Sequence, residues 1–109
     1  MAALLPALNA YESVFKQASG KNKKDCQGVL NGKYQGKLQD LAKNWCDEAK
    51  SFAVSEQCGS VGGSPDAPTL SCTETLTIQT KSGDPQTSHP QKTFHFAKNP
   101  DGTWGLSGW

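Results

Sequence analysis

The spacing of apolar residues in the N-terminal half of the chain predicts helices. Between Leu4 and Ala18 the apolar side chains recur at steps of three and four, which places them on one face of a helix. Pro6 is tolerated only in the first turn of such a helix, and Gly20 is a natural end. We therefore expect a first helix over residues 5–19.

Two more helical segments are predicted before residue 50. Asn22 and Asp25 resemble a capping box in which Asp takes the usual place of Glu or Gln, and Asn31-Gly32 suits the end of a short helix. A third helix is expected from Lys33 onward. Its apolar face would carry Tyr34, Leu38, Leu41, Ala42, Trp45 and Ala49.

The second half of the chain changes to an alternating pattern. Apolar and polar residues alternate there with period two, as in strands that have one buried face. The predicted strands cover residues 51–58, 72–79, 93–98 and 103–109. Segments 59–68 and 81–90 are expected to be loops, and Asn99-Pro100-Asp101-Gly102 suits a tight turn. Three helices followed by a curved four-stranded antiparallel meander make an α+β fold, and residues 1–109 have the length of one domain.

Four cysteines are many for so short a chain, and strand register suggests how they pair. Placing Cys58 opposite Cys72 aligns the apolar residues of the first two strands, because a one-residue slip would turn them outward. The aligned pairs are Val54 with Leu76 and Phe52 with Ile78. We expect a Cys58–Cys72 disulfide, which leaves Cys26 to pair with Cys46. Free buried thiols, or a metal or catalytic role, are the alternatives, but no pair has the C-x-x-C spacing.

The same register brings two acidic residues together. Glu56 lies opposite Glu74 on the otherwise apolar face, and like charges at this spacing repel unless a cation intervenes. Aligning the aromatic residues of the third strand with the second places Lys98 opposite Glu74. The pairs in this register are Leu76 with Phe96 and Ile78 with Phe94. The turn at 99–102 then sets Lys98 opposite Trp104, and Phe96 opposite Leu106.

Two interpretations of this acidic pair are open. In the first, Glu56 and Glu74 line the mouth of a pocket between sheet and helices, where one carboxyl group has a raised pKa and Lys98 is the counter-ion. In the second, the sheet extends beyond the helices and the three charges form a solvated ladder at its rim. Because surface charge ladders are common, we favour the second interpretation.

Charge and cysteine content restrict the possible binding partners and the cellular compartment of the chain. All 11 basic residues are Lys, set against 10 acidic residues, so the chain has neither the Arg nor the basic field that nucleic-acid binding uses. No apolar run is long enough to cross a membrane, and no signal peptide is visible. Two disulfides would require an oxidising compartment, the periplasm or the exterior of the cell. We therefore expect a processed chain or a fragment of a longer, membrane-anchored protein.

The order of these elements resembles a known family. The segments that carry the resemblance are Ala7-Leu8-Asn9-Ala10-Tyr11 with Val14-Phe15, then 38–45, 72–78, 93–96 and 102–106. Together they are similar to the NTF2-like (SnoaL-like, cystatin-like) cone, in the compact form found in extracytoplasmic domains of bacterial membrane proteins, including some Ser/Thr kinase-like proteins. The resemblance implies a conical pocket that serves as an enzyme site, a binding site or merely a core. It also implies homodimers through the outer face of the sheet.

The resemblance and the strand register together select six candidate ligand-binding residues. They are Tyr11, Glu56, Glu74, Phe96, Lys98 and Trp104. His95 is expected on the outer face of the sheet and His89 in a solvated loop, so no acid–base pair is assigned. We expect no catalytic residue, no metal and no cofactor.

Three functions follow from these expectations. The first is a non-catalytic extracytoplasmic domain of a bacterial signalling or envelope protein, which binds a small molecule or a protein. The second is a small isomerase or dehydratase that uses Glu56 or Glu74 as its base. The third is an interaction module, such as an inhibitor or immunity protein. Its binding face would present Trp109, Ala53, Thr73, Thr75 and Thr77.

Overall fold

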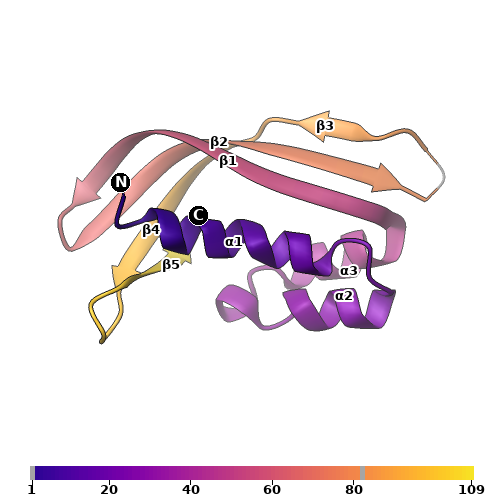
Figure 1. The fold of residues 1–109 in the computed structure, drawn as a ribbon, viewed down its shortest axis with the longest axis horizontal. Coiled ribbons are helices and arrows are strands. Elements are labelled where there is room, and N and C mark those ends of the chain that lie inside the picture. The colour runs from indigo at the N-terminus through magenta and orange to yellow at the C-terminus, as the bar shows by residue number, and fades with distance from the viewer. Residues whose placement is uncertain (1, 82) are drawn as a thin grey trace.

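The helices lie in the N-terminal half, as the apolar spacing predicted. A computed structural model describes residues 2–81 and 83–109 (Figure 1). Its helices are α1 (Leu5–Ala18), α2 (Lys23–Leu30), a short 3-10 helix η1 (Lys33–Gly36) and α3 (Gln39–Glu48). Within the described residues, none of the helices has the length and apolar character needed to span a membrane.

The strands form one curled antiparallel sheet that arches over the helices (Figure 1). They are β1 (Ala49–Ser64), β2 (Ala67–Thr80), β3 (Gln86–Ser88), β4 (Gln91–Lys98) and β5 (Trp104–Gly108). The main path runs β1-β2-β4-β5, and β3 pairs with β2 beside β4. The result is an α+β half-barrel with helices packed on its inner face, which confirms the predicted fold class.

The third helical segment is interrupted, in contrast to the prediction. Its first turn is the 3-10 helix η1, and α3 begins only at Gln39. Gly36 has a φ of +81° and Tyr34 a φ of +52°, and a continuous right-handed helix cannot contain either conformation. Tyr34 is held by packing, since its ring lies 5.9 Å from that of Tyr11 and 5.6 Å from that of Trp109. The side chain of Leu41, also assigned to this face, lies outside the described part of the chain.

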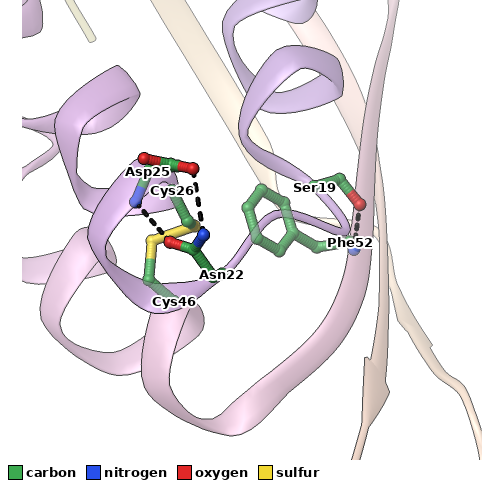
Figure 2. The surroundings of a disulfide bond; sticks show 6 residues. All are labelled: Ser19, Asn22, Asp25, Cys26, Cys46 and Phe52. Atoms are coloured by element: carbon green, nitrogen blue, oxygen red, sulfur yellow. Dashed lines mark hydrogen bonds between the residues drawn. A yellow bond between two sulfur atoms is a disulfide. The ribbon is translucent and has the colours of Figure 1, made fainter.

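The predicted cap and disulfide organise the corner between α1 and α3 (Figure 2). The Asp25 backbone N–H donates to the side-chain oxygen of Asn22, with 2.9 Å between the atoms, and the Asn22 amide donates to the Asp25 carboxylate. A disulfide joins Cys26 of α2 to Cys46 of α3. Both expectations are thereby confirmed, and the bridge ties the two shorter helices together.

The first hairpin is longer than predicted. β1 and β2 remain paired as far as Ser64 and Ala67, with an irregularity between Cys58 and Ser60. Residues 59–67, most of the segment expected to be a loop, are exposed on both faces. A strand that buries neither face has no reason to alternate apolar and polar residues, so its sequence is indistinguishable from that of a loop. The short strand β3 (Gln86–Ser88) was missed for the same reason, because all three of its residues are exposed.

The β1–β2 register agrees with the prediction, but the β2–β4 register does not. Phe94 lies opposite Leu70, eight positions along β2 from its predicted partner Ile78. β3 explains the difference, because it occupies the part of β2 around Leu76 and Ile78. β4 pairs instead with residues 69–73 of β2, a segment that begins three residues before the predicted strand.

The corrected register changes what surrounds the acidic pair. Apolar side chains now lie on both sides of Glu56 and Glu74 along the inner face, instead of on one side only. The buried set comprises Leu4, Leu8, Tyr11, Val14, Phe15, Ala18, Cys26, Leu30, Leu38, Ala42, Cys46, Phe52, Val54, Leu70, Cys72, Phe94 and Phe96. The two acidic residues therefore belong to the middle of the core face.

Candidate functional site

Two carboxyl groups from neighbouring strands meet on the inner face of the sheet. Glu56 lies opposite Glu74, two positions from the Cys58–Cys72 disulfide, whose Cα atoms are 4.0 Å apart. Both the cross-strand acidic pair and this second disulfide are as predicted. Glu74 is only 2% exposed, and both carboxyl oxygens of Glu56 are buried. The solvated rim ladder, the favoured interpretation, is therefore wrong.

Lys92, on β4, is the counter-ion of Glu74. Its Nζ lies 3.1 Å from Glu74 Oε2 and 3.2 Å from Oε1. The prediction of Lys98 for this role is wrong, because Lys98 lies opposite Trp104 near the β4–β5 turn, with its Nζ over the Trp104 ring. A sequence signal for Lys92 did exist: it precedes Phe94 by two residues, so the same alternation places it on the inner face.

Tyr11 connects helix α1 to this ion pair. Its hydroxyl donates to Glu74 Oε1 and accepts from Lys92 Nζ, at 3.2 Å in each case. Its ring packs between aromatic neighbours, with centroid distances of 5.2 Å to Phe94 and 5.3 Å to Trp109. Burial and the negative charge of Glu74 raise the pKa of Tyr11 far above its ordinary value. Tyr11 therefore remains a neutral hydrogen-bond donor within the core.

Glu56 differs from Glu74 in having no partner for its side chain. Neither of its carboxyl oxygens has a hydrogen bond, while its backbone N–H donates to Glu12 Oε1 at 2.9 Å. Burial, followed by the neighbouring Glu74 carboxylate, raises the pKa of Glu56 to about 9, and Lys92 opposes this only in part. At neutral pH we expect Glu56 to be a protonated carboxylic acid beside the Glu74–Lys92 pair.

The cluster of Tyr11, Glu56, Glu74 and Lys92 has the chemistry of an acid–base site, but a substrate cannot reach its carboxyl groups. Tyr11 is 1% exposed and Glu74 is 2% exposed, both carboxyl oxygens of Glu56 are buried, and the Lys92 side chain is 22% exposed. A general base must come within hydrogen-bond reach of the proton that it removes. In this conformation no substrate can approach either carboxyl group.

The remaining candidate residues lie elsewhere. Phe96 is fully buried in the core, and Trp104 is half-buried on the strand that follows the β4–β5 turn. The structure therefore brings together three of the six predicted ligand-binding residues, Tyr11, Glu56 and Glu74. Within the described parts of the chain, no group of three or more His, Cys, Asp or Glu side chains is placed to hold a metal ion.

An accessible groove lies on the other side of α1 from the core, along the edge of the sheet. It has a volume of about 610 Å³ between α1 and β1. Its lining residues are Asn9, Glu12, Ser13, Lys16, Ser19, Phe52, Ala53 and Val54. A smaller concavity of about 340 Å³ lies beside Trp45 and Ile78, where α3 meets the ends of β1 and β2.

Side chains of the α1 segment hold the open edge of β1 at two points. The Phe52 N–H donates to Ser19 Oγ at 2.9 Å (Figure 2), and Glu12 accepts from the Glu56 N–H at the same distance. Glu12 and Ser19 are seven residues apart, which is two helical turns and the same face of the helix. Sequence reasoning missed this groove because it depends on how α1 lies against the edge of β1, and its one signal was this repeat of polar residues beside the apolar stripe.

The outer face of the sheet carries a ladder of hydroxyl and amide groups. The cross-strand pairs are Thr73 with Gln91, Thr75 with His89, and Thr77 with Thr87. His95 is exposed, as expected, and so is His89. Trp109 does not join this face, because it packs half-buried against Tyr11 and Tyr34. The binding face suggested for an interaction module therefore lacks its aromatic residue.

Comparison of the chain with protein-family models, curated proteins and solved structures finds no match. The interpretation of the site therefore depends on its own geometry. That geometry contains two distinct features, a sealed acid–base cluster and an open groove.

Proposed function

We propose that the chain is a non-catalytic binding domain that acts outside the reducing cytoplasm, in the periplasm or the extracellular space. The observation that carries this proposal is the separation of the two features of the site. The groups capable of acid–base chemistry are sealed in the core, whereas the open groove is lined by polar and charged residues of the α1 segment and by the edge of β1. Accessible concave surface with a few polar groups is what a binding site requires.

The disulfides and the fold support this setting. Two modest-sized loops are closed by disulfides, which suggests an oxidising compartment. The helices and the curled sheet follow the order expected of an NTF2-like cone, whose compact extracytoplasmic members belong to bacterial signalling and envelope proteins. In this chain Tyr11 fills the interior of the cone, so we propose that the interior is a core and the groove is the binding surface.

An isomerase or dehydratase is the less favoured function. Such an enzyme would need substrate within hydrogen-bond distance of Glu56 or Glu74, and Tyr11, Phe94 and Trp109 occupy that space. Catalysis would therefore require the C-terminal strand to move away from α1.

The test is a fragment screen by NMR, with a library of small polar and peptide-like compounds and the oxidised chain. We expect shifts of backbone resonances at residues 9–19 and 52–54. Ser13→Trp, which fills the groove, should abolish them, and the matched outer-face variant Thr75→Trp should not. Perturbations centred on Tyr11 and Glu74, with consumption of a compound that Glu56→Gln prevents, would overturn the proposal in favour of an enzyme. Absence of any binding in the groove would also overturn it.

A further inference from the structure

We propose that the groove binds an extended peptide segment, which pairs with the backbone of Val54 on the edge of β1 and places a carboxylate near Lys16. This inference rests on the proposed binding function and names the class of its ligand. Edge strands commonly accept an added strand, with main-chain hydrogen bonds supplying affinity. Three features of the groove argue for this ligand.

The first feature is the direction of the Val54 backbone. In an antiparallel pair the residues alternate between those bonded to the partner strand and those whose N–H and C=O point away from it. The Phe52 and Glu56 N–H groups point away from β2, toward α1. Val54 is two residues from each, and the register irregularities of β1 lie outside this segment. Its N–H and C=O therefore point into the groove.

The second feature is the length of the opening. Ser19 occupies the N–H of Phe52, and Glu12 occupies that of Glu56, so these side chains mark the two ends. From Phe52 to Glu56 the strand advances by four residues, about 13 Å. The opening therefore matches the length of an extended peptide of about four residues. The groove is thus suited to a short extended segment, and its limits are set by α1.

The third feature is charge. Glu12 is already engaged by the backbone of β1, whereas Lys16 is exposed on the wall of the groove. The ion pairs in the described parts of the chain join Lys23 to Asp47 and Lys92 to Glu74, so neither involves Lys16. A ligand with a carboxylate, either an acidic side chain or a free C-terminus, would complement it.

The experiment uses fluorescently labelled pentapeptides and the oxidised chain, with binding followed by anisotropy. One set contains Asp or Glu at each position in turn with an amidated C-terminus, and a second set has a free C-terminus without acidic residues. Peptides that bind are then remade with single N-methyl groups. Because the C=O of Val54 accepts one N–H of the added strand, methylation should weaken binding about tenfold at one position and little at the others.

Variants test the role of Lys16. Lys16→Glu should weaken binding of the carboxylate peptide about fivefold, and Lys21→Glu, an exposed lysine outside the groove, should leave it unchanged. Whichever peptide set shows the Lys16 effect identifies the source of the carboxylate. Equal effects of both lysine variants, or an N-methyl profile in which no single position weakens binding more than the others, would overturn the peptide inference. Fragments that bind in the groove without any peptide binding would overturn it too, while leaving the proposed binding function in place.

Discussion

A carboxylic acid that is buried without a hydrogen-bond partner favours its neutral form, and Glu56 is such a residue. Its raised pKa links folding to pH in a definite direction. The folded chain keeps this proton at pH values at which the unfolded chain has lost it. The contribution of Glu56 to the free energy of unfolding is therefore complete at low pH and declines as pH rises from about 4.5 toward about 9.

Glu56→Gln keeps the shape of this side chain and removes its titration. We expect the variant to match the wild type in free energy of unfolding near pH 4.5, and to exceed it at pH 8. Urea denaturation at several pH values measures the free energy of unfolding of the variant and of the wild type. Asp84→Asn, at an exposed loop position, is the matched control. Its free energy of unfolding should change with pH as that of the wild type does. If the free energy of unfolding of Glu56→Gln has the same pH dependence as that of the wild type, Glu56 is not protonated in the folded state.

The ion pair of Glu74 with Lys92 provides a second test at this scale. Lys92→Met leaves a buried carboxylate without its counter-ion, and we expect a loss of about 3 kcal/mol in the free energy of unfolding. Lys98→Met, at the position that the sequence favoured, should change it by less than about 0.5 kcal/mol. Thermal and urea unfolding at pH 7 compare the two variants. Similar losses in both would contradict the observed register of β4.

At the scale of elements, the sequence predicted one strand register and not the other. The β1–β2 register was predictable because the apolar pairs and the Cys58–Cys72 bridge demanded the same alignment. The error between β2 and β4 is a slip of eight residues. An even-numbered slip leaves every side chain on its original face, so the hydrophobic pattern could not detect it. Detecting it required knowledge of β3, whose exposed residues carry no pattern.

The contact between α1 and the edge of β1 can be tested with a small change. Ser19→Ala removes the hydroxyl that accepts the Phe52 N–H, and we expect a loss of about 1 kcal/mol in the free energy of unfolding. Ser13→Ala, on the exposed face of the same helix, is the matched control and should have little effect. Hydrogen exchange at the Phe52 amide should also accelerate in Ser19→Ala alone. If that amide exchanges equally in both variants, Ser19 does not hold it.

At the scale of the whole molecule, one disulfide strengthens each half of the chain. Cys26–Cys46 lies among the helices and Cys58–Cys72 within the sheet, with sequence separations of 20 and 14 residues. Both pairings were predictable, because once the strand register chose one pair the other followed. The position of the acidic pair inside the core was not predictable, since it depends on how far the long hairpin extends and where β4 joins it.

Removing either bridge should destabilise the oxidised chain by a similar amount. For the double variants Cys26→Ser/Cys46→Ser and Cys58→Ser/Cys72→Ser we expect a loss of about 3 kcal/mol each, given the sizes of the closed loops. Mass spectrometry without reduction should show the wild type four hydrogen masses below its reduced form. A chain that folds with no such mass difference would contradict both bridges and the inferred compartment.

The hydrogen bonds that Glu12 and Ser19 accept from β1 have a consequence for self-association. An exposed edge strand offers a template on which copies of a protein can stack into fibrils. Over residues 52–56 the first helix occupies two of the outward N–H groups, so another sheet cannot extend along this stretch. A chain in which this helix is detached should therefore aggregate through β1. The single open position at Val54 is narrow enough to admit one short strand without starting unlimited growth.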